Sequence, residues 1–310
     1  MNPSLPEVRV GEPTRCGALA VFPLYAERPL FGPEYSLAHE ALDDGTLVVR
    51  EACEIGSVPE MFAENNGDLP CLVLEGMELR GSKQTRMMNV SVLVGSRSWA
   101  RMPVSCVEHG RWSYDSPQSS SGSHCPPSLR ALLKGSAGSR RQGLGSCQIA
   151  IWAEISRKHR ALGVTSTTED LSSALETHRE RVAQLQERLP YPASANGVAV
   201  ALGGKLVSID IVDKPVTLEK VWNRLTEGFA LDGIETQGAG CEMTAVKVSA
   251  ALQRMKGLGW QPVEPVGLGE EWRARNDGML ANALFFSGAL LHASASLLRV
   301  GHSGETSQAV

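Results

Sequence analysis

The sequence lacks the signatures of several large protein classes. No Cys-x-x-Cys pair occurs among its seven cysteines, and their number is odd, so no disulfide framework is indicated and we expect reduced thiols. An excess of charge of one sign is also missing. With a net charge of -4 over 310 residues and a pI near 6.0, the chain is not expected to be a general nucleic-acid or membrane-surface binder.

Long apolar runs are rare as well. The run from Met279 to Leu298 is long enough to cross a bilayer, but Ser287 and Gly288 in its middle are typical of a turn between two buried strands. The N-terminus carries prolines and charges where an export signal needs an apolar core. We therefore expect no membrane span and a cytoplasmic location.

Standard nucleotide-binding and catalytic motifs are absent too. Gly203-Gly204-Lys205 lacks the spacing and the following hydroxyl of a phosphate loop, and Gly267-x-Gly269 lacks a third glycine that opens a helix. There is no His-Glu-x-x-His and no Gly-x-Ser-x-Gly. These absences argue against the P-loop, Rossmann, zinc-peptidase and serine-hydrolase classes. We predict no metal site, and the sequence names no cofactor.

What the sequence does contain is typical of an α+β protein. Its hydrophobic residues make up 42% of the chain and its charged residues 21%, a balance typical of a soluble protein with a sizeable core. The first third has short apolar runs between Gly, Pro, Asp and Asn clusters, which favours antiparallel strands. These runs cover residues 16–24, 36–41, 46–51 and 58–62. We expect one domain over residues 1–310, in which this β-rich part packs with helices and further hairpins of the C-terminal part.

The rest of the chain alternates between helices and hairpins. Apolar periodicity and capping residues predict four helices, over residues 148–161, 168–189, 217–229 and 241–256. Turn residues predict two hairpins, 196–202 with 206–212 and 280–286 with 289–294, and a further strand over 271–275. The Ser- and Gly-rich segment 113–146 predicts a mobile insertion that carries one short helix at 128–134.

The stretch from Cys71 to Trp112 combines apolar strands with isolated polar residues. Strands over 71–79, 86–94 and 102–107 would form an antiparallel meander. Strand parity places Glu75 in a row of apolar residues, Asn89 and Ser91 in a second row, and Glu108 in a third. Polar groups in apolar rows need hydrogen-bonding partners, so these four residues are the first candidates for a functional site.

The partners of Glu75 depend on the register of the meander. A two-residue turn at 81–82 pairs Glu75 with Met88, and a turn with one more residue pairs it with Asn89. The register also decides whether Lys83, Gln84 and Arg86, which lie between the two strands, fold back over Glu75 or face a ligand beside it. A buried structural ion pair between them and a ligand-facing carboxylate are both open interpretations.

The same stretch resembles a known family. The residues that carry the resemblance are Glu75-Gly76, Lys83-Gln84-x-Arg86, Asn89-x-Ser91, Pro103 to Glu108 and Gly110-Arg111-Trp112, together with a first strand at Ala18 to Leu24 and a closing motif of Gly267-Leu268-Gly269, Glu271 and Arg273. They are similar to the ARG and rhodanese-phosphatase-superfamily-associated protein domain, and the similarity covers nearly the whole chain. The resemblance implies an intracellular α+β domain associated with ADP-ribose and NAD metabolism.

Three functional hypotheses follow. In the first, the hairpin borders a pocket for an ADP-ribose or NAD-derived ligand, and Glu75 or Glu108 acts as general acid or base on a glycosidic bond. Lys83 and Arg86 would hold a diphosphate. The remaining ligand contacts would come from Gln84, Asn89, Ser91, Trp112 and Gln148. In the second hypothesis the same pocket reads the ligand without turnover, and in the third the polar row only fixes the strand register.

Overall fold

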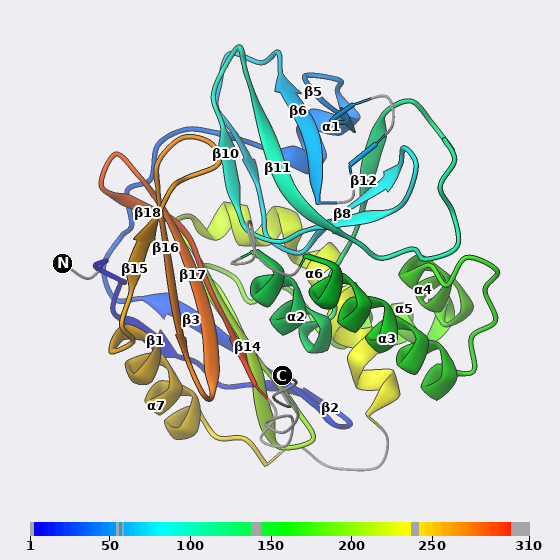
Figure 1. Cartoon of the computed structure of the whole chain (residues 1–310). Coiled ribbons are helices and arrows are strands. Elements are labelled where there is room, and N and C mark those ends of the chain that lie inside the picture. The colour runs from blue at the N-terminus through cyan, green and yellow to red at the C-terminus, as the bar shows by residue number, and fades with distance from the viewer. Residues whose placement is uncertain (1–2, 54–55, 58, 138–143, 237–241, 299–310) are drawn as a thin grey trace, which may run out of the picture.

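The largest sheet joins the two ends of the chain. In the computed structural model, which describes residues 3–53, 56–57, 59–137, 144–236 and 242–298, nine strands form this sheet in the order β1-β3-β13-β14-β18-β17-β16-β15, with β2 beside β3. They are β1 (Val8–Val10), β2 (Thr14–Cys16), β3 (Leu19–Ala26), β13 (Gly197–Leu202), β14 (Lys205–Val212), β15 (Gln261–Val263), β16 (Glu270–Asn276), β17 (Met279–Phe286) and β18 (Ala289–Leu297). The opening strand β3 and the closing strand β18 thus belong to one sheet (Figure 1). That the chain is one domain stays a prediction.

Two tight turns in this sheet are where the sequence predicts them. Gly203 and Gly204 connect β13 to β14 with φ angles of 54° and 78°, and Ser287 and Gly288 connect β17 to β18 with 53° and 76°. Two successive residues with positive φ are the mark of a type I′ turn, which matches the twist of the strands that it joins. Both predicted hairpins are confirmed.

A six-stranded and a three-stranded sheet hold the 71–112 stretch. The six-stranded sheet has the order β12-β8-β9-β11-β6-β5, and the three-stranded sheet has the order β10-β7-β4. Their strands are β4 (Ser36–Leu37), β5 (Leu47–Glu51), β6 (Glu60–Asn65), β7 (Cys71–Val73), β8 (Met77–Gly81), β9 (Arg86–Met88), β10 (Val92–Val94), β11 (Ser98–Cys106) and β12 (Ser119–His124). The meander exists as β8-β9-β11, but the two expected long strands are each broken in the middle, at 74–76 and at 89–91. Their halves belong to different sheets.

The register of the meander differs from both registers that the turn lengths predict. Glu78 pairs with Met87 and Leu79 pairs with Arg86 in β8 and β9, and the pairing of β7 with β10 continues the same offset. The connection therefore spans more residues than either predicted turn, because Leu79 with Arg86 is the last pair of the β8–β9 ladder. Both predicted pairings of Glu75 are wrong.

The helices cover both faces of the large sheet. They are α1 (Ala38–Asp43), α2 (Pro127–Ala137), α3 (Leu144–Leu162), α4 (Leu171–Thr177), α5 (Arg179–Glu187), α6 (Pro215–Glu235) and α7 (Ala245–Lys256). The apolar side of α7 packs on one face of the sheet and that of α6 on the other. Figure 1 shows α2 beside α6, between the large sheet and the meander. That position lets α2 contact β17, β18 and β11.

Two segments depart from the predicted elements. Residues 38–41, expected as the end of a strand, belong to helix α1, because Ala38, Glu40 and Ala41 are better helix formers than strand formers. The single helix expected over 168–189 is two helices, α4 and α5, which meet at His178, a residue with a φ of -108° and a ψ of 19°. The predicted start at 168 lies three residues early, since Asp170 caps α4 by accepting the N–H of Ser172.

The segment 113–146 contains more structure than the sequence predicts. Its short helix is confirmed as α2, but residues 119–124 also form β12, which pairs with β8. Serine-rich composition conceals this strand, because Ser119, Ser123 and His124 are buried by their neighbours rather than by their own apolar character. Residues 138–143 lie outside the described part of the chain. The mobility of the segment stays a prediction.

Candidate functional site

The two strand breaks bring the polar residues of the meander to the junction of the three sheets. Gly76, in the first break, has a φ of 81°, and a Cβ at this position would lie 2.6 Å from the ring of His124. Only glycine adopts this conformation at low cost and leaves space for the ring. The turn at Gly76 directs the Glu75 side chain out of the meander and toward α2.

Glu75 is the centre of a buried ionic cluster. Its side chain is 1% exposed and accepts hydrogen bonds from Nη2 of Arg130 at 3.0 Å, from Nδ2 of Asn282 at 3.0 Å and from Oγ of Ser294 at 2.9 Å. Nζ of Lys134 also donates to it. The predicted partners Lys83 and Arg86 do not contact Glu75. Arg130 and Lys134 reach it instead because they lie one turn apart on α2 and face the same way.

The charges of this cluster balance. Arg130 donates from Nη1 and Nη2 to both carboxylate oxygens of Asp210, at 2.5 and 2.6 Å, so two carboxylates face two cations. Burial alone would raise the pKa of Glu75, but Lys134 and Arg130 outweigh it and lower that pKa to about 2. Burial also lowers the pKa of Lys134, in spite of Glu75. Both carboxylates are thus ionised at neutral pH.

A serine and a histidine extend this cluster. Oγ of Ser91 lies 2.7 Å from Nδ1 of His292, and Nε2 of His292 lies 3.3 Å from Oδ1 of Asp210. The same Ser91 oxygen accepts the backbone N–H of Glu75 at 2.9 Å. A small cavity of about 10 Å³ borders Ser91 and His292, with Glu271 and Asn282 in its wall.

Glu108 belongs to a separate arrangement. It accepts two hydrogen bonds from Arg111, at 2.7 and 2.6 Å, and the backbone N–H and hydroxyl of Thr85. Burial would raise the pKa of Glu108, but Arg111 and the Thr85 N–H outweigh it and lower that pKa. Glu108 therefore anchors the 83–86 segment to the chain that follows β11.

Lys83, Arg86 and Trp112 come together as the sequence predicts, but around a different carboxylate. Arg86 is fully buried and makes a two-pronged ion pair with Glu51, with its two nitrogens 3.0 and 3.3 Å from the carboxylate oxygens. The backbone N–H of Lys83 donates to the same carboxylate at 3.0 Å. Nζ of Lys83 lies 5.8 Å from the ring centre of Trp112 and 5.1 Å from that of Tyr114. Both distances lie within the range of a cation–π interaction.

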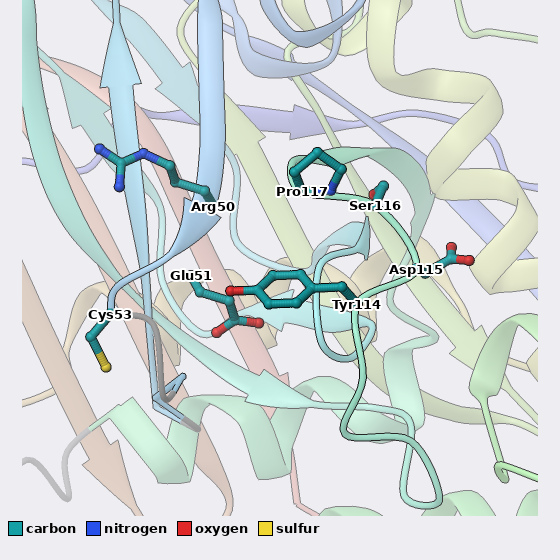
Figure 2. Close-up of a pocket in the computed structure, with 7 residues that line it drawn as sticks. All are labelled: Arg50, Glu51, Cys53, Tyr114, Asp115, Ser116 and Pro117. Atoms are coloured by element: carbon teal, nitrogen blue, oxygen red, sulfur yellow. The ribbon is translucent and has the colours of Figure 1, made fainter.

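A pocket of about 470 Å³ opens beside this group. Figure 2 shows it between the end of β5, which carries Arg50 and Glu51, and the 114–117 segment, whose Asp115 points away from the other labelled side chains. Its lining residues are Arg50, Glu51, Cys53, Tyr114, Asp115, Ser116 and Pro117. Tyr114 and the neighbouring Trp112 remain 52% and 45% exposed. The lining thus combines one accessible aromatic ring, Tyr114, with one cation, Arg50, and two carboxylates, Glu51 and Asp115.

A second hollow, of about 600 Å³, lies between α4, α5 and the end of β8. Its lining is polar and includes Arg80, Glu176, Arg179 and Glu227 but no aromatic ring. Arg179 donates to both carboxylate oxygens of Glu176, and Arg80 donates to Glu78 at 2.7 Å. The first pocket, which has the Tyr114 ring in its lining, therefore offers more to a ligand with an aromatic base.

The three remaining predicted residues make hydrogen bonds within the fold. Asn89 accepts the hydroxyl of Ser105 at 2.9 Å. Gln148 accepts the backbone N–H of Cys106 at 3.0 Å and donates to its carbonyl at 2.8 Å, which fixes α3 to the end of β11. Gln84 is buried, and its backbone carbonyl accepts a hydrogen bond from Nη1 of Arg86 at 3.3 Å.

Comparison with protein families gives a match that covers nearly the whole chain. The sequence matches the ARG and Rhodanese-Phosphatase-superfamily-associated Protein domain over residues 7–296. The chain belongs to this family. The family name records an association with ARG and rhodanese-phosphatase superfamily proteins. Searches of curated proteins and of solved structures gave no match.

The closing motif by which the sequence resembles the family has a structural reason. A Cβ on Gly267 would lie 2.2 Å from the carbonyl oxygen of Leu93, and Gly269 has a φ of 102°. These glycines let the chain pass close to β10, where Leu268 bridges to Leu93. Glu271 then pairs with Arg273 at 2.5 Å beside the cavity at Ser91. The motif thus closes the junction that holds the ionic cluster.

Sequence reasoning missed seven residues of the ionic cluster and of the pocket beside Lys83: Arg50, Glu51, Tyr114, Arg130, Lys134, Asp210 and His292. A signal exists for three of them. Asp210 and His292 are polar residues in apolar strands, the same pattern that identifies Glu75, and Glu51 ends an apolar run. Arg130 and Lys134 lie in a segment whose composition is typical of an exposed loop, which hides their burial.

Within the described ranges, each helix is too short or too polar to span a lipid bilayer. The same ranges contain no group of three or more His, Cys, Asp and Glu side chains placed to bind a metal ion.

Proposed function

We propose that this domain binds an ADP-ribose or NAD-derived ligand in the pocket beside Lys83. The observation that carries the proposal is the position of the Lys83 ammonium near two exposed rings, Trp112 and Tyr114, at the edge of a pocket of about 470 Å³. Pockets that bind small molecules commonly measure about 300–1,000 Å³. The ligand class itself comes from what the sequence resemblance implies, an association with ADP-ribose and NAD metabolism.

The chemistry of the pocket suits a nucleotide with a diphosphate. Exposed aromatic rings stack on purine bases, and cations at their edge pair with phosphate oxygens. Tyr114 and Trp112 supply the rings, while Lys83 and Arg50 supply the cations. The Arg86–Glu51 pair is buried and Glu51 belongs to the pocket lining, so the pair fixes this part of the pocket wall.

Binding without turnover is the form of this function that the geometry favours. A general acid or base at neutral pH needs a pKa near 7, whereas ion pairing lowers the pKa of Glu75 to about 2 and also lowers the pKa of Glu108. Neither carboxylate lines the pocket. We therefore assign Glu75 and Glu108 to the stability of the fold and propose that the pocket reads the ligand.

Calorimetric titration with ADP-ribose, NAD and AMP tests the proposal. We expect saturable binding of at least one of them, with affinity reduced at least about tenfold in Tyr114→Ala and in Lys83→Met, because stacking of a base and a charged contact each contribute about 1–3 kcal/mol. Phe31→Ala and Lys220→Met are matched controls, since both residues are exposed and lie outside the pocket.

Two results would overturn the proposal. The first is the absence of a heat signal, and of any rise in melting temperature, with all three nucleotides at millimolar concentration; a ligand at 100 times its Kd stabilises a protein by about 2.7 kcal/mol. The second is an unchanged affinity in both pocket variants. Chromatography of the mixture after prolonged incubation then separates the reader from an enzyme, because an enzyme releases products.

A further inference from the structure

The hollow between α4, α5 and the end of β8 contains two opposite charges that the proposed ligand pocket does not use. Its volume of about 600 Å³ lies within the usual range of small-molecule sites. Arg80 of β8 and Glu227 of α6 both line it. Because β8 and α6 are far apart in the sequence, the fold and not a local motif brings these two side chains to one hollow.

Arg80 presents hydrogen-bond donors that its protein neighbours do not use. Its Nε donates to Glu78 at 2.7 Å, and Glu78 is itself fixed by hydrogen bonds from Ser123 and Ser172. Among the described residues, neither Nη1 nor Nη2 of Arg80 has a hydrogen-bond partner, and the side chain is 44% exposed. Two parallel N–H groups of a guanidinium match the two oxygens of a carboxylate. Arg80 is therefore oriented to bind a carboxylate of a ligand.

Glu227 supplies the opposite charge. It is partly buried, and within the part of the chain that the structure describes its carboxylate accepts no hydrogen bond and forms no ion pair. Burial and then the charge of Glu78 raise the pKa of Glu227, although Arg80 and Arg224 oppose them from a distance. The carboxylate thus lacks a close cation, and an ammonium group of a ligand would supply one.

The rest of the lining adds an acceptor and an apolar side. Nε2 of Gln186 donates to the carbonyl of Asn223 at 2.8 Å and to the hydroxyl of Thr226 at 3.0 Å, which fixes the orientation of the Gln186 amide and leaves its Oε1 as an acceptor. Burial of an apolar group of a ligand against aliphatic side chains is favourable. The aliphatic residues of this lining are Leu175, Val182 and Ala183.

We propose that this hollow binds a free α-amino acid with an apolar side chain, such as leucine. The α-carboxylate pairs with Nη1 and Nη2 of Arg80, the α-ammonium pairs with Glu227 and Gln186, and the side chain lies against the aliphatic residues. A simple anion would leave Glu227 without a partner, and a simple amine would leave Arg80 without one. A zwitterion satisfies both, so its chemistry differs from that of the nucleotide proposed for the pocket beside Lys83.

Calorimetric titration of the intact protein with leucine, N-acetyl-leucine and leucinamide tests the proposal. N-acetyl-leucine lacks the ammonium group, and leucinamide lacks the carboxylate. We expect leucine to bind at least about tenfold more tightly than either analogue, because a hydrogen bond to a charged group changes affinity by about this factor or more. Glu227→Gln should abolish the preference for leucine over N-acetyl-leucine and keep the preference over leucinamide. Arg80→Met should do the reverse.

Glu180→Gln and Arg181→Met are the matched controls. Both residues are exposed on α5 and lie outside the lining of the hollow, so their replacement should leave the affinity for leucine unchanged. Equal affinities of the wild type for the three compounds, or no binding of leucine at millimolar concentration, would overturn the proposal. The three titrations of the wild type decide the question even if Arg80→Met does not fold.

Discussion

Replacement of Glu75 by glutamine distinguishes a structural role of this carboxylate from a ligand-binding role. Glutamine keeps the shape of the side chain but removes its charge, so Lys134 and Arg130 then face a single carboxylate, Asp210. Breaking a fully buried ion pair by removal of one partner costs about 3–5 kcal/mol, because an uncompensated charge stays buried. The pKa of Glu75 supports this size: a fall from 4.5 to about 2 corresponds to about 3 kcal/mol at about 1.4 kcal/mol per pKa unit.

The assay is urea unfolding at several pH values. Because the folded-state pKa of Glu75 is lower than its unfolded value, its stabilising contribution is complete above pH 4.5 and is lost as the pH falls toward about 2. The difference between wild type and Glu75→Gln should therefore be about 3–5 kcal/mol at pH 7 and should shrink steadily below pH 4.5. A difference under about 1 kcal/mol at pH 7 would refute the buried ion pair.

The double variant Glu75→Gln/Lys134→Met provides the control. It removes one charge of each sign, so Arg130 and Asp210 remain as a balanced pair. The stability of the double variant should exceed the value expected from the two single variants by about 1–3 kcal/mol. Additive losses would mean that the two charges do not interact.

Three further outcomes follow from the same structure. Gly76→Ala should lower the free energy of unfolding by about 1–3 kcal/mol, measured by urea unfolding, because the positive φ and the His124 ring both oppose a Cβ. Burial, and to a smaller extent the charge of Glu78, raise the pKa of Asp170 to about 6, above its value in the unfolded chain. The free energy of unfolding should therefore fall as the pH rises from about 4 to 6. Asp170→Asn, which keeps the cap of α4, should remove this pH dependence. In a hydrogen-exchange measurement, the amides of β12 that pair with β8 should be protected, while the amides of residues 113–117 should exchange quickly. Uniform fast exchange over residues 113–124 would contradict the pairing.

Local signals account for the part of the fold that the sequence predicts. The two hairpins depend on adjacent residues, Gly203-Gly204 and Ser287-Gly288, whose backbone preferences set the turn. The break at Gly76 depends on a single glycine inside an apolar run, a pattern that also fits a continuous strand. For this reason, the strand was predictable and its interruption was not.

The ionic cluster shows the limit of reasoning from one sequence. A charged residue in an apolar row identifies Glu75 as a residue that needs partners, and this inference is confirmed. Its partners Arg130 and Lys134 lie 55 and 59 residues away, in a segment whose serines and glycines suggest an exposed loop. Their burial comes from the packing of α2 between two sheets, which no local pattern records.

A crystal structure of the protein grown with ADP-ribose tests the central claim most directly. The account predicts difference density in the pocket between β5 and the 114–117 segment, with a base against Tyr114 or Trp112 and the diphosphate within ion-pair distance of Lys83 or Arg50. An empty pocket at a concentration well above the calorimetric Kd would contradict the account. Density confined to the polar hollow beside Arg80 and Arg179 would contradict it equally.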